Sequence, residues 1–586
     1  MKTAPVFHIM YFNLLSYAQK CIFAVIFCFV FLAVQIGSAA DYYINNETLS
    51  VSSEIGSFDN MFHVQGSGLL VSDNTDIRAA FTYTDGTPLH IQLKNSGGKW
   101  VVPQSSSMFA KENIYVTCAD ETYLAFGQWS PSDLFTSFTG TLFVNETADV
   151  RIETTGWGFN VDLAGGTLQF SSGMGFKANV INISKDSTLT CSDWLVLENQ
   201  TEANLKSITG TRNLTVLGNG YVAFNGYGNA TKYEGKFIVG TSVTTGGVHA
   251  EIGNAFNPNA GGVILVNGTL NFNNNTQTLY DFEYRGGTLE NFADSGDTPS
   301  LTINHEFKFN SSETLNFATS LAGVGSVVVD GGGTLNFTGN TSYTGDTTIT
   351  NGTLSFTGSK TLNNLSGTNT GNLSTDAALT LSTGTDKVNT YTGSINVGTN
   401  TITVSGEGRQ QLVADSITAS EIIHQSGMLD VSGQLNSSLT ISGGEISPGI
   451  TLGSLNVGEN FSLGADATLR MDIGGITTEL NDSLTVLGTV SFDPESTIFL
   501  NFAESYIPNM EDTVEIQLPS GMDSDLILNI LNSEFYNLFS YNPDTGVLSA
   551  SVAGVPEPST LCLFLLAMAG VLYLKKCSTS KNEKIS

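Results

Sequence analysis

A short alternation of polar and apolar positions recurs in the middle of the chain. The pattern Thr-Leu-x-Phe, with a looser copy at the second position, begins at Thr269, Thr288, Thr314, Thr334 and Thr353. These threonines are 19, 26, 20 and 19 residues apart. Because alternate side chains of a strand point to opposite faces, each copy predicts a β-strand with Leu and Phe on one face. Asn-Gly or Gly-Gly often precedes the pattern and predicts a tight corner with positive φ.

A second element recurs at wider intervals. It consists of an aromatic residue, any residue, a glycine and a short alternating strand, and it begins at Phe138, Tyr233, Tyr343 and Tyr391. Together the two patterns make the chain repetitive from roughly 120 to 400, with insertions between copies.

A repeat of about 20 residues is typical of a parallel β-solenoid, in which each strand stacks on the equivalent strand of the next rung. We therefore expect an all-β fold with a solenoid (β-helix) body at 121–439. Polar residues of successive rungs should align in Thr and Asn ladders along the axis. A β-sandwich, or several antiparallel modules, is the competing interpretation, since short strands bounded by glycine fit those folds too.

The repeats are flanked by regions of different texture. Residues 41–120 are interpreted as an N-terminal β region or cap. From Gly443-Gly444 and Ser447-Pro448-Gly449 onward, further alternating segments predict a C-terminal β cap domain at 440–553. A solenoid requires such caps because its last rung would otherwise present an open edge.

Both ends of the chain carry targeting features. Basic residues precede an apolar run at 21–36, and small residues lead to Ala40, which predicts a signal peptide at 1–40 with cleavage after Ala40. At the other end, 554–586 holds Val555-Pro556-Glu557-Pro558, an apolar stretch at 561–574 and two lysines. The apolar stretch is about 21 Å long as a helix, which is short for a bilayer core of roughly 30 Å unless flanking residues extend it. A hydrophobic transmembrane helix is the expectation; a plain C-terminal anchor is the alternative.

The order of these three parts in the tail resembles the PEP-CTERM sorting signal of Gram-negative bacteria. The resemblance implies export, passage through the inner membrane as a precursor, and processing near Val555, Pro556, Glu557 and Pro558 by an exosortase-like membrane transpeptidase. It implies final placement at the cell surface, in the outer envelope or outside the cell.

Residues 331–354, GGGTLNFTGNTSYTGDTTITNGTL, resemble the autotransporter-associated β-strand repeat of large bacterial surface proteins. The match is close over these residues and weaker elsewhere. It implies a solenoid and a surface setting.

Charge narrows the range of partners. The chain has 54 Asp+Glu against 23 Lys+Arg, a net charge of −31. Non-specific binding to nucleic acid through charge is therefore disfavoured. Only Cys118 and Cys191 lie between the two hydrophobic ends. They form either one disulfide in an oxidising compartment or two buried thiols.

The motif search predicts no cofactor and no metal site. No nucleophile elbow, zinc-protease helix or phosphate-binding loop is present in the sequence. An enzyme on a β-helix would need carboxylates and an Arg or Lys gathered on one face. The arginines of the body (Arg78, Arg151, Arg212, Arg285, Arg409 and Arg470) are instead spread along the chain.

These observations favour a structural protein of the cell surface or extracellular matrix, without enzymatic activity. Its expected partners are the transpeptidase, the export machinery and the membrane through the C-terminal helix, with extracellular polysaccharide as a candidate. The alternatives are a β-helix carbohydrate-active enzyme and a glycan-binding adhesin.

Overall fold

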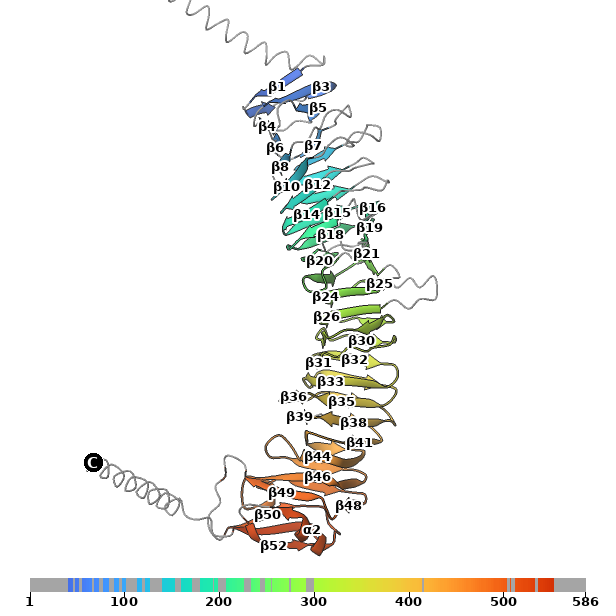
Figure 1. Ribbon diagram of the computed structural model, residues 1–586, viewed down its shortest axis with the longest axis vertical. Helices are drawn as coiled ribbons and strands as arrows, with labels where there is room; N and C mark the ends of the chain where they lie inside the picture. Colours follow the sequence, from blue (N-terminus) through green and yellow to red (C-terminus); the bar gives the residue numbers. More distant parts are fainter. Residues whose placement is uncertain are drawn as a thin grey trace, which may run out of the picture. The chain divides into compact units, whose positions relative to one another are not determined.

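The computed structural model is all-β and contains a parallel β-solenoid (Figure 1). It describes residues 41–552 apart from 46–47, 52–54, 66–67, 73–76, 84–88, 94–96, 102–112, 119–121, 127–139, 153–159, 171–179, 193, 199–206, 226–232, 243–247, 254–255, 273–275, 291–299, 414–415, 503–505, 507–511 and 533–535. The signal peptide predicted at 1–40 and the tail predicted at 554–586 lie outside the described residues. In the part of the chain that the structure describes, no helix has the length and hydrophobicity needed to span a bilayer.

The chain divides into two compact units. Unit 1 comprises Met1–Asn310 and Ala318–Gly325, and unit 2 comprises Ser311–Phe317 and Ser326–Ser586.

Unit 1 is built from stacked parallel strands that belong to four sheets. Sheet 1A has the order β1 (Asp41–Asn45), β3 (Ile55–Gln65), β5 (Ile77–Tyr83). Sheet 1B has the order β17 (Ser207–Gly210), β14 (Val180–Lys185), β12 (Asn160–Ala164), β10 (Thr141–Asn145), β8 (Ile114–Cys118), β6 (Leu89–Leu93), β4 (Gly68–Ser72), β2 (Thr48–Val51). Sheet 1C has the order β7 (Gly97–Val101), β9 (Thr122–Phe126), β11 (Asp149–Ile152), β13 (Thr167–Phe170), β15 (Ser187–Cys191), β18 (Leu214–Gly218), β20 (Lys236–Val239), β22 (Gly262–Leu265), β24 (Gln277–Tyr284), β26 (Ser300–Phe309), β28 (Ser320–Ala322). Sheet 1D has the order β16 (Trp194–Glu198), β19 (Tyr221–Asn225), β21 (His249–Gly253), β23 (Thr269–Asn271), β25 (Thr288–Glu290).

Unit 2 repeats this construction with three sheets. Sheet 2A has the order β27 (Thr314–Phe317), β30 (Thr334–Phe337), β32 (Gly352–Phe356), β34 (Gly371–Thr375), β37 (Ser394–Asn396), β40 (Ile417–Thr418). Sheet 2B has the order β29 (Ser326–Val329), β31 (Asp346–Ile349), β33 (Lys360–Gly367), β35 (Leu379–Thr383), β36 (Val388–Tyr391), β38 (Thr401–Gly406), β39 (Arg409–Leu412), β41 (Glu421–His424), β42 (Met428–Val431), β44 (Ser438–Ser447), β46 (Phe461–Ile473), β48 (Val490–Phe492), β49 (Thr497–Phe502), β51 (Leu531–Asn532). Sheet 2C has the order β43 (Gly433–Leu435), β45 (Ser454–Val457), β47 (Ser483–Val486), β50 (Thr513–Gln517), β53 (Val547–Val552), β52 (Tyr536–Asn542).

The register confirms that the Thr-Leu-x-Phe copies stack on one another. Thr269 pairs with Thr288 in sheet 1D. In sheet 2A, Thr334 pairs on one side with Thr314 and on the other with Thr353. The equal spacing of these copies therefore reflects one rung of the solenoid per repeat.

The apolar half of each copy forms the core. Leu335 and Leu354 are fully buried, and the rings of Phe337 and Phe356 stack with centroids 5.4 Å apart. Each rung presents only a narrow apolar stripe, so neighbouring rungs must cover it, and stability comes from stacking. The glycine before the motif has φ of 111° at Gly352, as the sequence predicted, because a side chain at that corner would be strained.

The aromatic-x-Gly element marks a corner of the rung. The hydroxyl of Tyr391 lies 3.0 Å from the carbonyl oxygen of Gly371 in the preceding rung and 3.1 Å from that of Ser394. Tyr233 is buried in the same way against Arg212 and Lys236. A buried hydroxyl that bonds to main-chain carbonyls holds the turn between two strands.

Parallel pairing runs through the regions predicted as caps. The described strands at 41–120 pair in parallel. In unit 2 the predicted boundary at 440 falls within β44, and parallel pairing continues to β49 and β51. Antiparallel pairing begins where β53 joins β50 and β52. This end also carries the 3-10 turn η1 (Thr478–Leu480) and the helix α2 (Ser524–Ile530), whose first turn is capped by Asp523.

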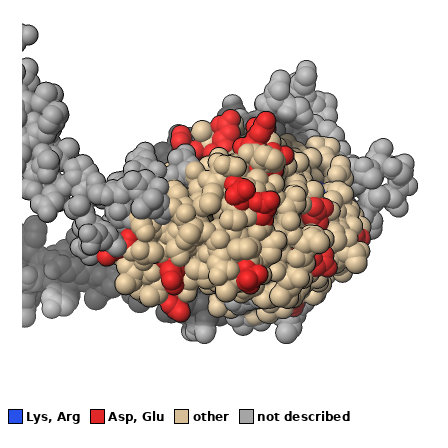
Figure 2. Space-filling view, turned by 90° about the horizontal axis from the view of Figure 1, so that it is seen from below, with Lys and Arg blue, Asp and Glu red and all other residues tan. Residues whose placement is uncertain are grey.

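The surface at this end of unit 2 is acidic. Seen from the end where β50 and β52 lie, Figure 2 shows Asp and Glu side chains but no Lys or Arg among the described residues. The sequence explains this, because no Lys, Arg or His lies between Arg470 and Lys575.

Candidate functional site

The processing residues predicted in the tail, Val555, Pro556, Glu557 and Pro558, lie outside the described residues, as does the predicted cleavage residue Ala40. The two cysteines of the body are described. Cys118 and Cys191 are buried thiols, and their Sγ atoms donate to the carbonyl oxygens of Asp149 at 3.8 Å and Tyr221 at 3.5 Å. The structure thus agrees with the thiol alternative.

Charged side chains gather on the outer face of four successive strands of unit 1, β20, β22, β24 and β26. One column of aligned positions holds Lys236, Gly262, Asp281 and Glu306. The neighbouring column holds Ile238, Ile264, Glu283 and Lys308. We refer to Lys236, Asp281, Glu283, Arg285, His305, Glu306 and Lys308 as the charged face.

The carboxylate of Asp281 lies between two basic groups. Its Oδ1 is 2.7 Å from Nδ1 of His305, and its Oδ2 is 4.0 Å from Nζ of Lys236. The imidazole of His305 stacks on the ring of Tyr280 with centroids 4.6 Å apart, which fixes its orientation. Asp281 is therefore positioned by contacts from two other rungs.

Glu283 is held by a second set of contacts. Arg285 donates from Nε at 2.8 Å and from Nη2 at 3.0 Å to its two oxygens, and Asn310 donates at 3.2 Å. Partial burial alone would raise the pKa of Glu283, but the hydrogen bonds from Arg285 and Asn310 outweigh burial and leave the pKa below its ordinary value. Glu283 is thus a charged carboxylate at neutral pH.

A glycine hollows this face. A Cβ at Gly262 would lie 2.3 Å from the carbonyl oxygen of Asp281, so only glycine fits. The resulting pocket has a volume of about 30 Å³ and is lined by Lys236, Gly262, Val263, Ile264, Asp281, Phe282, Glu283, Glu306 and Lys308. That volume suits one or two water molecules or a single protruding group of a larger ligand.

The charged face combines groups that recognise and act on saccharides. Carboxylates accept hydrogen bonds from sugar hydroxyls, and lysines attract acidic groups. A carboxylate beside a histidine and a lysine also supplies the elements of acid–base chemistry. Within the described ranges, no His, Cys, Asp and Glu side chains are grouped closely enough to hold a metal ion.

Sequence reasoning missed this site because its members are far apart along the chain. The arginine search counted one residue per region, yet Arg285 joins Lys236 and Lys308 on one face. A repeated triplet marks the face in the sequence, since Lys236-Phe237-Ile238, Asp281-Phe282-Glu283 and Glu306-Phe307-Lys308 share a central phenylalanine. Those phenylalanines are buried, so the flanking residues must point outward.

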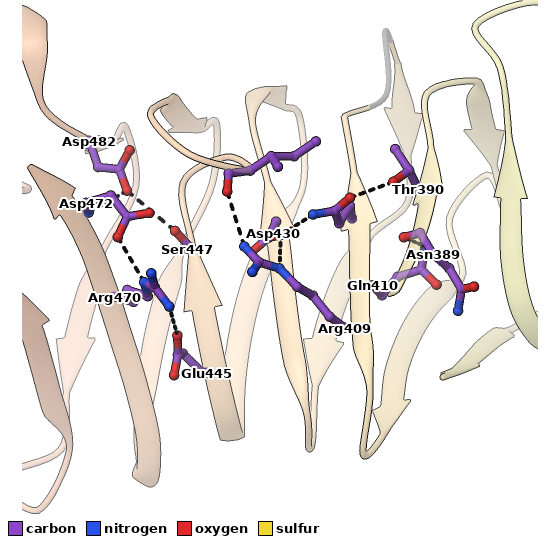
Figure 3. A network of polar contacts seen from close by, with 12 residues as sticks. Asn389, Thr390, Arg409, Gln410, Asp430, Glu445, Ser447, Arg470, Asp472 and Asp482 are labelled. Carbon is purple, nitrogen blue, oxygen red and sulfur yellow. Dashed lines mark hydrogen bonds and ion pairs between the residues drawn. The ribbon is translucent and has the colours of Figure 1, made fainter. Parts of the chain in front are cut away.

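A second polar cluster lies in unit 2 beneath the loop at 448–453 (Figure 3). Arg409 donates from Nε to Asp430 at 2.5 Å and from Nη2 to the carbonyl oxygen of Ile450 at 3.2 Å. Gln411 donates to the same oxygen of Asp430 at 2.9 Å. Asp430 is fully buried, and its Oδ1 has no hydrogen-bond partner among the described residues. Burial raises the pKa of Asp430, while Arg409 and Gln411 oppose this rise.

The cluster continues to Asp482, whose carboxylate joins three chain segments. It accepts from the main-chain N–H of Gly453 at 2.7 Å and of Asp472 at 2.8 Å, and from the hydroxyl of Ser447 at 3.4 Å. Burial raises the pKa of Asp482 to about 7. Because the loop covers these groups, we interpret this cluster as structural rather than as a ligand site.

A scan against protein-family models finds no match, and no curated protein is similar to the chain at a significant level.

Proposed function

We propose that the chain is an exported structural protein of the cell surface or extracellular matrix. After removal of the segment ending at Ala40, its tail is processed near Val555, Pro556, Glu557 and Pro558 by an exosortase-like transpeptidase. The tail helix holds the precursor in the inner membrane, and release places the solenoid outside.

One observation carries this proposal. The outward columns of the sheets are dominated by small polar side chains in unbroken register, such as Asn316 and Asn336, whose amides bond at 3.0 Å. Such ladders add stability along the axis without forming a cleft, as a scaffold requires. The charge of −31 supports solubility and repulsion between chains outside the cell.

The proposal is tested on the protein from its native host. We expect the intact mass of the mature chain to show loss of residues 1–40 and a cut near Pro556, with the protein at the surface. A chain with Pro556→Ala, Glu557→Ala and Pro558→Ala should remain in the inner membrane. If the wild-type chain keeps its tail through Ser586, and the variant behaves identically, the tail is a plain anchor and processing is excluded.

The charged face favours a second candidate, a carbohydrate-binding or carbohydrate-active protein. The cluster of Asp281, Glu283, Glu306, Lys236 and Lys308 on one face is the arrangement that such an activity needs. Its lysines suit an acidic polysaccharide better than a neutral one.

This second candidate is tested with soluble polyuronates and with neutral polysaccharides. Affinity electrophoresis would detect binding, and absorbance of unsaturated products or release of reducing ends would detect cleavage. We expect Lys308→Ala and Asp281→Asn to weaken either effect, whereas Lys185→Ala, an exposed lysine paired with Glu146, should leave it intact. Equal mobility and no product with every polymer would eliminate this candidate and leave the scaffold proposal untouched.

A further inference from the structure

The outer face of sheet 2A carries only small uncharged polar residues. Two columns of aligned positions run across its strands, and we call them the Thr/Ser/Asn face. The first column holds Thr314, Thr334, Thr353, Asn372 and Ser394, and the second holds Asn316, Asn336, Ser355, Ser374, Asn396 and Thr418. All of these side chains are exposed or half-buried.

The face is a regular lattice. None of the five pairings within sheet 2A contains a register shift. Strands are spaced at about 4.8 Å, and residues two apart in a strand are roughly 6.7 Å apart. Between the two columns lie buried residues such as Leu335 and Leu354, which anchor the strands to the core. Hydroxyl and amide groups therefore repeat at fixed intervals in two directions.

The composition of the face argues against most partners. No charged group is present to bind an ionic polymer or a lipid headgroup. No aromatic ring is present on which a sugar would stack. With six strands, the lattice covers about 24 Å by 7 Å, well under the roughly 800 Å² per partner that a stable protein interface buries.

We propose that the Thr/Ser/Asn face binds the surface of ice. Each hydroxyl or amide holds a first-shell water, and the lattice sets these waters at intervals close to the oxygen repeats on a prism face of hexagonal ice. The aligned side chains are held by a rigid core, so little entropy is lost when they order the water layer. This activity does not depend on the function proposed above.

The test uses the purified full-length chain in a mild detergent, with the detergent buffer and serum albumin as blanks. Ice recrystallisation is followed by microscopy, and crystal shape and growth are followed in a nanolitre osmometer. We expect the wild-type chain to arrest recrystallisation and to shape the crystals. Thr353→Lys places a charge in the middle of the lattice and should raise the concentration required by about tenfold. Val388→Lys, at a position 63% exposed on β36 outside the face, should have no effect.

Several outcomes would overturn the proposal. Crystals that grow as in serum albumin would exclude ice binding, and equal activity of Thr353→Lys and Val388→Lys would exclude this face. Circular dichroism of Thr353→Lys, together with Thr353→Ser as the conservative variant, separates loss of binding from loss of fold. Sedimentation as a dimer that Thr353→Lys abolishes, without any effect on ice, would assign the face to a second copy. Retention on insoluble polysaccharide, again without an effect on ice, would assign it to a glycan.

Discussion

The corner at Tyr391 depends on the glycine two residues later. A Cβ at Gly393 would lie 2.0 Å from the carbonyl oxygen of Gly371 and 2.7 Å from the hydroxyl of Tyr391. We predict that Gly393→Ala destabilises unit 2 by about 1–3 kcal/mol, because the added methyl forces the two rungs apart. The urea midpoint measured by circular dichroism should fall. Gly384→Ala is the matched control, since its nearest neighbour would be 3.5 Å away, and an equal fall for both variants would contradict the prediction.

A single buried carboxyl makes the stability of unit 2 depend on pH. The pKa of Asp482 is about 7 in the folded chain, chiefly because burial disfavours the charged form, and its ordinary value is 3.8. Between these values the folded state binds a proton that the unfolded state has lost. Stability is therefore fully present below about pH 4 and is lost as pH rises towards 7, with a slope of at most about 1.4 kcal/mol per pH unit.

Calorimetry between pH 4 and 8 tests this dependence. Asp482→Asn should flatten the pH profile, although the amide loses one hydrogen bond and lowers the overall stability by about 1–3 kcal/mol. Asp430 and Glu445 also have raised pKa values from burial, so the comparison rests on the difference between wild type and variant. Glu495→Gln, an exposed position, should keep the wild-type profile. A variant as pH-dependent as the wild type would assign the effect to other carboxyls.

At the scale of the element, Arg409 joins a strand to the loop at 448–453. We predict that Arg409→Ala destabilises unit 2 by about 3–5 kcal/mol, because Asp430 would be left buried without its counter-ion. Loss of the bond to the carbonyl oxygen of Ile450 should also speed hydrogen exchange in that loop, measured by mass spectrometry.

The double variant Arg409→Met with Asp430→Leu separates charge from packing. It removes the buried charge together with its partner, so stability should recover relative to Arg409→Ala. Exchange at 448–453 should remain fast, because the bond to Ile450 is still absent. If the double variant is no more stable than Arg409→Ala, burial of the unpaired charge is not the cause.

Elements whose repeat lies within one rung were predictable from the sequence. Thr334 and Thr353 have the same residues around them and lie 19 residues apart, so their register followed directly. The interval of 26 residues from Thr288 to Thr314 was less informative, since these two threonines belong to different sheets. Insertions between rungs change the spacing without changing the pattern of the strand.

The charged face could not be predicted in the same way. Lys236, Asp281 and Lys308 meet because four rungs of unequal length place them in neighbouring columns. Their residue types differ from rung to rung, so a search for repeats passes over them. The central phenylalanines repeat because the core constrains them, whereas the outward positions are free to vary.

At the scale of the whole molecule, charge is distributed unevenly along the sequence. Thirteen acidic residues lie between 472 and 544, and no Lys, Arg or His accompanies them in that span. The acidic end surface in Figure 2 belongs to this segment, which ends in the antiparallel hairpin of β52 and β53. Like charges beside a terminal edge discourage pairing with another chain, and they also weaken the fold through repulsion.

This repulsion predicts a salt dependence of stability. Raising NaCl from 10 mM to 0.15 M shortens the Debye length from about 30 Å to about 8 Å, so the urea midpoint of unit 2 should rise. Replacing two exposed acids, as in Glu495→Lys with Asp544→Lys, should stabilise the chain by about 0.2–1 kcal/mol per site at low salt and reduce the response to NaCl. The exchange of Glu495 and Asp544 for Gln and Asn gives the intermediate case, with half the change in charge. A midpoint that falls with salt, or three chains that respond equally, would show that repulsion at this end does not limit stability.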